Sequence, residues 1–202
     1  NPHFLYNTLE TIRMKAFAAG NREVATAIKL LGKSLRYVLD NTGTVSTTLA
    51  KEIDYLHIYF SIQQLRFGDR ILYTVDIQEG LDLTNYQILP LLLQPIVENA
   101  VSHGLANVES GGKILLRIYE QDDTCLRIDI SDNGVGMTDE ELMLLRKNIS
   151  EKDTGRTQSI GLYNINQRLC LCYGPEYALT VSSAQGRGTM VSLRLPLNKL
   201  ME

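Results

Sequence analysis

Apolar residues recur at alternating intervals of four and three positions in the first third of the chain, and this spacing constrains the fold more than any other feature. The first stripe is Leu5, Leu9, Ile12, Ala16 and Ala19, and the second is Val24, Ile28, Leu31, Leu35 and Val38. Such intervals place side chains on one face of an α-helix. Gly20-Asn21 interrupts the pattern between the stripes. The spacing therefore predicts two antiparallel helices that form a hairpin with one apolar face.

A third helix is predicted beyond Asn41-Thr42-Gly43, which ends the second one. Thr47 or Thr48 is a suitable N-cap. The same spacing then continues through Leu49, Ile53, Leu56, Phe60 and Gln63. The apolar face of a hairpin needs a partner, and two hairpins can form a four-helix bundle. We therefore expect a homodimer, although the hairpin could instead pack on the second domain of its own chain.

The rest of the chain mixes strands and helices. Gly68-Asp69 marks the expected boundary between a helical domain, 1–68, and a second domain, 69–202. Within the second domain the pattern predicts strands at 71–77, 114–120, 125–131, 177–183 and 189–195, and helices at 86–103, 138–147 and 160–172. The second of these helices is expected to follow Thr138, with Glu140 and Glu141 in its first turn. This succession favours an α+β sandwich with helices on one face of a mixed sheet.

Charge and hydropathy exclude some classes of function. The formal net charge is −3, which argues against nucleic acid as the main partner because such binding needs a basic face. No run approaches the roughly 20 apolar residues of a membrane helix, and no signal peptide is visible. The chain begins at Asn1 without an initiator Met. We expect a cytoplasmic part of a longer protein, with membrane contact only through upstream segments.

The segment Asn1-Pro2-His3-Phe4-Leu5-Tyr6-Asn7 contains a candidate nucleophile. His3 and Asn7 are four residues apart and share one face of the first helix. A solvent-facing imidazole is largely neutral at pH 7, and its ring nitrogen is then a competent nucleophile. Asn7 could hold that ring by hydrogen bonding. The alternative is an ordinary surface histidine.

The apolar helix that contains Leu91-Leu92-Leu93-Gln94-Pro95 is interrupted by Glu98, Asn99 and His103. Asn99 and His103 are one turn apart and face the same way. An amide oxygen suits Mg²⁺, and an imidazole can reach a phosphate. The alternative is a helix end with ordinary capping groups.

A strand is expected to run directly into Asp132-Asn133-Gly134-Val135-Gly136. A carboxylate fixed at a strand end can accept a hydrogen bond from an exocyclic amine such as that of adenine, and the glycines allow close approach of backbone. A simple turn is the alternative. Further on, the polar stretch 148–159 leads into a helix start near Gly161, where free N–H groups suit a phosphate chain. No GxxxxGK[ST] string is present in the sequence.

Taken in order, these segments resemble the cytoplasmic part of LytS/YesM-type sensor histidine kinases of the GHKL ATPase superfamily, over essentially the whole chain. NPHFLYNTL resembles the phosphoacceptor box of that family, LLLQPIVENAVSHG its N box, DNGVGM its G1 box and SIGLYNINQRL its G2 box. The resemblance implies a helical dimerisation and phosphotransfer region followed by an ATP-binding catalytic domain.

The resemblance also implies roles for single residues. His3 would accept the γ-phosphoryl group of ATP and pass it to an aspartate of a response regulator. The expected nucleotide-binding residues are Asn99, which would also bind Mg²⁺, His103, Asp132, Gly134, Gly136, Gly161, Leu162 and Thr189. Residues 148–159 would form a lid. The cofactors implied are ATP and Mg²⁺, and the full-length protein would be anchored in the inner or plasma membrane.

Some positions depart from the pattern. Phe4 follows His3, where many other histidine kinases have an acidic residue, so no general base is assigned; Glu10 and Glu98 are the nearby carboxylates. Ser102 and Ser159 stand where relatives often have Lys and Gly, and Gly155 could supply the missing flexibility. Pro95 occupies the place of the water-activating glutamate of the gyrase and Hsp90 branch, which disfavours an ATPase. The remaining alternative is an ATP-binding regulatory module that signals by dimer rearrangement without self-phosphorylation.

Overall fold

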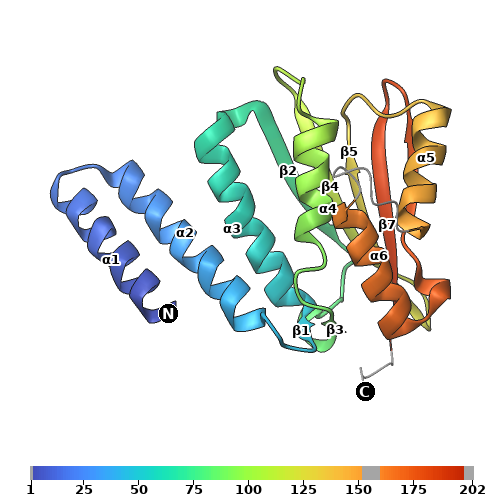
Figure 1. Cartoon of the computed structure of the whole chain (residues 1–202), viewed down its shortest axis with the longest axis horizontal. Coiled ribbons are helices and arrows are strands. Elements are labelled where there is room, and N and C mark those ends of the chain that lie inside the picture. The colour runs from blue at the N-terminus through green and yellow to red at the C-terminus, as the bar shows by residue number, and fades with distance from the viewer. Residues whose placement is uncertain (1, 152–159, 198–202) are drawn as a thin grey trace.

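The computed structural model describes residues 2–151 and 160–197. Three consecutive helices lie side by side, and a mixed β-sheet with further helices on one face follows them (Figure 1). The three helices are α1 (Pro2–Ala18), α2 (Arg22–Asn41) and α3 (Leu49–Phe67). The predicted α+β architecture, with its N-terminal helical hairpin, is therefore confirmed.

The hairpin of α1 and α2 leaves much of its apolar surface open. No side chain of α1 is buried, and Phe4 and Phe17 are 68% and 58% exposed. Leu5, Ile12 and Leu31, three members of the predicted stripes, are also exposed. The guanidinium of Arg36 on α2 lies over the Tyr6 ring on α1, with its Cζ 5.1 Å from the centroid. Helix α2 in turn packs on α3 through stacked Tyr37 and Tyr55, whose centroids are 4.3 Å apart.

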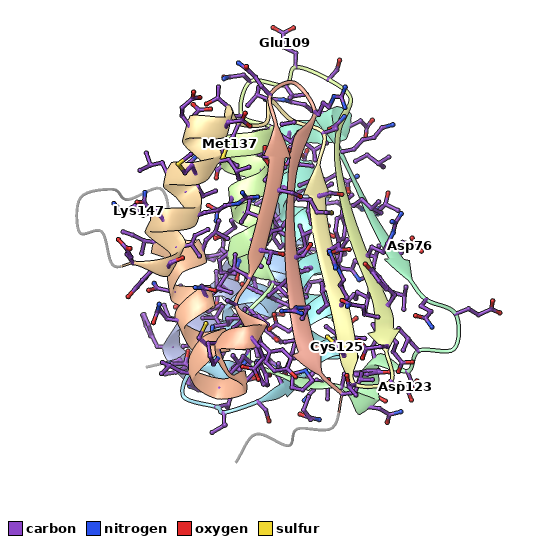
Figure 2. The ribbon with its side chains drawn as sticks, turned by 90° about the vertical axis from the view of Figure 1, so that its right-hand side faces the viewer. Asp76, Glu109, Asp123, Cys125, Met137 and Lys147 are labelled. Carbon is purple, nitrogen blue, oxygen red and sulfur yellow. The ribbon has the colours of Figure 1, made fainter. Side chains whose placement is uncertain are left out.

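The main sheet has the strand order β2-β4-β5-β7-β6. Its strands are β2 (Ile71–Ile77), β4 (Gly112–Asp122), β5 (Cys125–Asp132), β6 (Thr180–Ala184) and β7 (Gly188–Pro196). Strand β2 pairs with β4 in parallel, and the other pairs are antiparallel. The helices α4 (Gln94–Asn99), α5 (Asp139–Ser150) and α6 (Ile160–Tyr173) cover one face, as Figure 2 shows from the side.

The helix predicted at 86–103 is wrong in its first half. Residues Gln87–Ile88 form strand β3, which pairs with β1 (Thr47–Thr48). Helix α4 begins only at Gln94 and continues into a π-helical segment, Ala100–Gly104. Two prolines explain the difference. Pro90 disfavours helical backbone at the residue before it, whereas Pro95 fits the first turn of α4, where its missing N–H has no partner to lose.

The strand predicted at 177–183 begins later than expected, because Pro175–Tyr177 forms a 3₁₀ turn before β6. The N-cap predicted at Thr47 or Thr48 is confirmed at Thr48. The Thr48 side chain accepts from the Lys51 N–H at 3.3 Å. Thr138 forms a capping box with Glu141 at the start of α5. The described residues contain no helix that is both long enough and apolar enough to cross a membrane.

One hydrophobic core joins α3 to the sheet. Leu49, Ile53 and Leu56 of α3 belong to the same buried cluster as Leu116 of β4 and Ile128 of β5. Helix α3 therefore packs as a layer of the sheet domain, although it follows the hairpin in sequence. The domain boundary at residues 68 and 69 stays a prediction.

The buried side chain of Asn166 fixes α6 on this core. Its Nδ2 donates to the carbonyl of Ile149 at 3.1 Å, and its Oδ1 accepts from the Leu179 N–H at 2.9 Å. These backbone groups lie at the end of α5 and just before β6. Because a buried polar group without a partner is costly, Asn166 determines how α6 meets both elements.

We expect Asn166→Ala to lower the free energy of unfolding by about 2–4 kcal/mol, since two buried backbone groups lose their partner. Urea denaturation measures this change. Asn164→Ala, at an exposed position of the same helix, is the control and should stay within about 0.5 kcal/mol of wild type. Equal effects of the two substitutions would contradict the assignment.

Candidate functional site

A cavity of about 390 Å³ lies between the sheet and its covering helices. The segment of α4 and its π-helical continuation form one wall, α5 forms another, and the ends of β5 and β7 form the floor. The lining residues include Ile96, Asn99, His103, Asp132, Met137, Glu141, Leu145, Asn148, Leu162, Thr189 and Val191. The wall is largely apolar, with a few polar groups facing inwards, as is typical of small-molecule sites.

Asp132 is the carboxylate at the floor of this cavity. It is the last residue of β5, and its Oδ1 accepts from the Gly134 N–H at 2.9 Å. A second backbone hydrogen bond comes from Thr189 on the neighbouring strand β7. Burial nevertheless raises the pKa of the Asp132 carboxyl above its ordinary value, because those two bonds do not fully offset the loss of solvent. A carboxylate has about four acceptor sites, so these two hydrogen bonds leave it capacity to accept another.

Three glycines allow backbone to close around Asp132. A Cβ on Gly104 would lie 2.7 Å from the Asp132 carboxyl, and one on Gly188 would lie 1.9 Å from the Asp132 carbonyl oxygen. A Cβ on Gly134 would lie 1.8 Å from the Gly104 carbonyl oxygen. The Val135 N–H also donates to that oxygen at 3.1 Å. Side chains at these positions would separate the three segments that meet at Asp132.

Gly136 shapes the edge of the same region. Its φ is +64°, and a Cβ there would lie 1.9 Å from the Ala184 carbonyl oxygen. Both the backbone conformation and the close approach require glycine. Met137 follows directly and reaches the cavity from between α5 and the sheet (Figure 2).

Asn99 and His103 lie on the wall that faces α6. The Nδ2 of Asn99 is buried and has no hydrogen-bond partner within residues 2–151 and 160–197, which is unusual for a buried amide. A Cβ on Gly161, at the start of α6, would lie 3.7 Å from this atom. A molecule in the cavity can accept a hydrogen bond from Nδ2, and the amide oxygen of Asn99 is a suitable ligand for Mg²⁺. The residues present therefore fit a magnesium–nucleotide ligand. The π-helical turn between Asn99 and His103 is a feature often found at functional sites.

The predicted lid is only partly described. Residues Asn148 and Ile149 are buried in the last turn of α5, so this part of the predicted stretch 148–159 is helix rather than lid. Residues 152–159, with Gly155 and Ser159, lie outside the described residues. Leu162 lines the cavity, and Gly161 adjoins it beside Asn99.

His3 and Asn7 are not among the residues that line the cavity. Helix α1 lies on the opposite side of α2 and α3 from α5 (Figure 1). His3 is exposed, and Asn7 Nδ2 is 3.3 Å from its Nδ1, as the i, i+4 spacing predicts. The structure thus brings together the predicted residues between Asn99 and Thr189 but keeps His3 apart from them.

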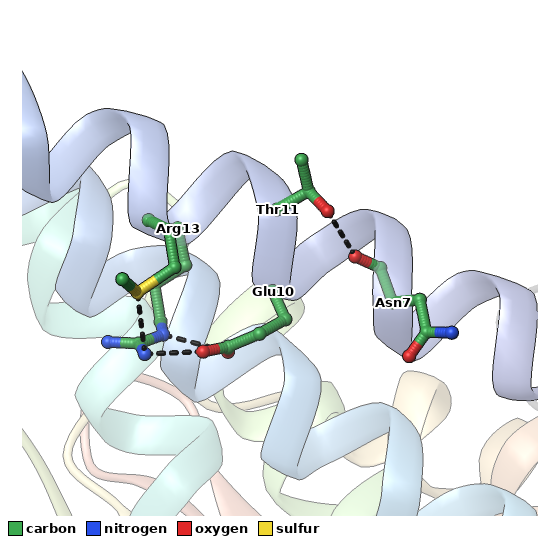
Figure 3. A network of polar contacts seen from close by, with 5 residues as sticks. Asn7, Glu10, Thr11 and Arg13 are labelled. Carbon is green, nitrogen blue, oxygen red and sulfur yellow. Dashed lines mark hydrogen bonds and ion pairs between the residues drawn. The ribbon is translucent and has the colours of Figure 1, made fainter.

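Glu10, near Asn7, and Glu98, next to Asn99, are the two carboxylates that were considered as a general base. Each is bound by a neighbour on its own helix. Figure 3 shows Glu10, one helical turn beyond Asn7, paired with Arg13 at 2.5 Å. The hydrogen bond and charge of Arg13 lower the pKa of Glu10. Glu98 accepts from Gln94 Nε2 at 2.6 Å on α4. Neither contact identifies a general base.

Sequence reasoning missed several residues of the site. Gly104 and Gly188 were not singled out, because nothing in their local sequence shows that their partner is Asp132. The apolar wall of Ile96, Met137 and Leu145 was also missed, since such residues are indistinguishable from core positions without the fold. For Gly104, the available sequence signal was its position directly after His103.

Two sequence families match the chain. Residues 1–71 match the family described as Histidine kinase, and residues 85–199 match the family described as Histidine kinase-, DNA gyrase B-, and HSP90-like ATPase. The Sensor protein kinase HptS of Staphylococcus aureus is 29% identical over 198 residues, which is 98% of this chain and 37% of that protein. The chain therefore spans little more than a third of the length of these curated relatives.

Solved structures support the fold. The histidine kinase domain of the blue-light activated histidine kinase from Erythrobacter litoralis EL346 gives a TM-score of 0.54 at 18% identity, covering 95% of this chain and 83% of that one. The catalytic domain of the histidine kinase ThkA gives 0.54 at 14% identity, covering 75% and 96% respectively.

The raised pKa of Asp132 makes stability depend on pH in a defined direction. As pH rises from the ordinary value of 3.8 through the raised pKa, the folded state keeps a proton that the unfolded state has lost. Folding is then progressively disfavoured. We therefore expect the stability of wild type relative to Asp132→Asn to fall as pH rises through this window, measured by urea denaturation between about pH 3.5 and about pH 7.

Asp123→Asn, at an exposed turn position, is the matched control for removing a carboxylate. It should show no such fall. A difference between wild type and Asp132→Asn that is constant with pH would contradict the burial of this charge.

Proposed function

The chain belongs to the histidine kinase-, DNA gyrase B- and HSP90-like ATPase family, and we propose that it binds Mg-ATP and transfers the γ-phosphoryl group to His3. The observation that carries the proposal is a half-buried carboxylate with spare acceptor capacity, Asp132, in the same cavity as the Asn99 amide, whose Nδ2 has no hydrogen-bond partner among the described residues.

Adenine fits the floor of the cavity chemically. Its exocyclic amine is a donor for the Asp132 carboxylate, and a hydrogen bond to an ionised acceptor in a buried site is a strong one. The apolar side chains of Ile96, Met137 and Leu145 line the same space and would cover the faces of the ring. Thr189 lies beside Asp132, and its hydroxyl is 2.9 Å from that of Ser183. The Ser183 hydroxyl donates to the Gly188 carbonyl at 2.8 Å, so the Thr189 hydroxyl donates to Ser183 and keeps lone pairs that can accept a hydrogen bond beside the carboxylate.

The phosphates would extend towards α4 and the start of α6. Asn99 would provide an oxygen to Mg²⁺, and His103 would lie near the phosphates. Bound Mg²⁺ would neutralise charge on the phosphate oxygens. Phosphoryl transfer needs mainly positioning and charge neutralisation from the protein, and these residues supply both from a fixed wall.

Transfer to His3 requires the hairpin to approach the nucleotide. A nitrogen of the neutral His3 imidazole forms the new bond to the γ-phosphorus, the bond from that phosphorus to the bridging oxygen breaks, and ADP leaves with the electron pair. The ring then loses its N–H proton to water, to which the exposed His3 side chain is open. Either α1 moves relative to the sheet domain, or His3 is supplied by a second copy of the chain.

We propose that the chain forms a homodimer through the hairpin. The exposed side chains Leu5, Phe17 and Leu31 on α1 and α2 would be covered when two hairpins form a four-helix bundle. The phosphoryl group would then pass to an aspartate of a response regulator. The curated relatives are named sensor protein kinases, so we propose that the intact protein is a membrane-anchored sensor whose cytoplasmic part is this chain.

His3→Gln should abolish labelling by γ-labelled Mg-ATP and leave nucleotide affinity within about twofold of wild type, because His3 lies outside the cavity. Acid-labile, alkali-stable label that maps to His3 is the expected wild-type result. His57→Gln is the control, because His57 is also an exposed histidine but lies on α3. This variant should label normally. Label that persists in His3→Gln would reject this phosphoacceptor. Nucleotide binding without any label in wild type would favour the regulatory-module alternative.

Asp132→Asn should weaken nucleotide binding by about 10- to 150-fold, the loss of one charge-assisted hydrogen bond of about 1.5–3 kcal/mol. Calorimetric titration with ADP and Mg²⁺ measures this loss. Asp123→Asn should bind as wild type does. An unchanged affinity in Asp132→Asn would show that the adenine amine is not recognised here.

A further inference from the structure

Glu52 on α3 is a fully buried carboxylate, with 0% of the residue exposed, and both of its oxygens are occupied. Oε1 accepts from the Leu91 N–H at 2.7 Å and from the hydroxyl of Tyr37. Oε2 accepts from the N–H groups of Leu92 and Leu93 at 3.1 and 3.3 Å. One side chain therefore binds three consecutive backbone amides some forty residues along the chain.

The backbone of residues 90–93, which Glu52 binds, is strained and accepts or donates hydrogen bonds on two sides. Leu91 has a φ of +55°, a conformation that costs energy in a residue with a Cβ and persists where its surroundings enforce it. Arg168 on α6 donates to the carbonyls of Pro90 and Leu91 at 2.5 and 3.3 Å. The amides of this segment thus face α3, and its carbonyls face α6.

Helix α4 begins directly after this segment. It is short, Gln94–Asn99, and has no side-chain N-cap of its own. Its first turn is bonded to the held segment, because the Ile96 and Val97 N–H groups donate to the Leu93 carbonyl, each at 3.2 Å. The position of Leu93 consequently determines where Asn99, the last residue of α4, meets the cavity.

Tyr37 connects this arrangement to the hairpin. It lies on α2, and its ring stacks on Tyr55 of α3. Burial and the nearby Glu52 carboxylate raise the pKa of the Tyr37 hydroxyl, so it remains a donor. The contact runs from the helix next to α1, through Glu52, to the backbone that precedes Asn99.

A buried charge is a poor choice if stability alone is needed, because desolvation is costly and apolar side chains of similar size do as well or better. A carboxylate is suited to fixing the direction of several amides at once. We propose that Glu52 is a positioning residue that sets Asn99 in the nucleotide cavity, and that the Tyr37 hydroxyl joins this position to hairpin helix α2. The inference rests on the proposed nucleotide site.

The test compares three variants with a matched control. Glu52→Gln keeps the size of the side chain but replaces one carboxylate oxygen by an NH₂ group. That group is a donor and cannot accept hydrogen bonds from backbone N–H groups. Tyr37→Phe removes only a hydroxyl and keeps the aromatic ring. Tyr73→Phe is the control, since the hydroxyl of Tyr73 is also buried and has no partner among the residues that the structure describes. The third variant combines Tyr37→Phe with Glu52→Gln.

Two measurements are made on each variant. Calorimetry with ADP gives the Kd with Mg²⁺ and with EDTA, and its stoichiometry counts folded sites. Amide hydrogen exchange of the unliganded protein reports the protection of Leu91, Leu92 and Leu93. A purely structural role would lower melting temperature and protection throughout, without changing the ratio of the two Kd values.

We expect Glu52→Gln to raise the Kd for Mg-ADP about tenfold while the Kd in EDTA stays within about twofold. Exchange at the three amides should accelerate. Tyr37→Phe should raise the Kd for Mg-ADP about two- to fivefold, and Tyr73→Phe should leave it unchanged. Because Tyr37 acts through Glu52, the double variant should match Glu52→Gln alone.

Equal weakening with and without Mg²⁺, additive effects in the double variant, or wild-type binding by both single variants would overturn the positioning role. If Glu52→Gln does not fold, Tyr37→Phe against Tyr73→Phe decides the question. A wild-type protein that binds neither ADP nor Mg-ADP would instead reject the proposed function, so the two failures are distinct.

Discussion

The close approach of three backbone segments at Asp132 is the constraint on which the site depends. The end of β5, the start of β7 and the end of the π-helical turn meet there, and each contributes a glycine where a Cβ would collide with a neighbour. This contact fixes the depth of the cavity floor, because Gly104 and Gly134 bring the wall that carries His103 against the end of β5. The rest of the sheet domain, with its helices on one face, holds these segments at that separation.

Much of the fold was predictable because its signals are local. The alternating apolar spacing predicted α1, α2 and α3, and Thr48 and Thr138 marked helix starts through side chains that cap their own backbone. The exception was the apolar run before Asn99. Periodicity there suggested one long helix, yet Pro90 and the left-handed Leu91 break it. What stabilises the break is Glu52, and its contact with residues 91–93 cannot be seen from either segment alone.

In the candidate site, too, residues with a local sequence signal could be predicted, whereas residues that depend on distant neighbours could not. Residue type and spacing predicted Asp132, Asn99 and His103 as candidates, because a polar side chain that interrupts an apolar element is unusual, and all three line one cavity. Gly104 and Gly188 could not, since their importance comes from a neighbour on another strand or helix. The apolar lining of Met137 and Leu145 follows from how α5 lies over the sheet, which no local pattern in the sequence encodes.

Glu52 and Asp132 are both carboxylates shielded from solvent, but their hydrogen-bond partners differ. The partners of Glu52 show that it orients backbone, and those of Asp132 leave it able to accept a further hydrogen bond. Each oxygen of Glu52 accepts two hydrogen bonds from the protein itself, so nothing is left for a ligand and the carboxylate acts on the chain. Among the described residues, Asp132 has backbone donors from Gly134 and Thr189, and burial outweighs their effect, so its pKa is raised. A hydrogen-bond donor in the cavity would offset part of the cost of removing this carboxylate from water. The first carboxylate therefore stabilises the strained backbone at Leu91, whereas the second keeps acceptor capacity on the cavity side.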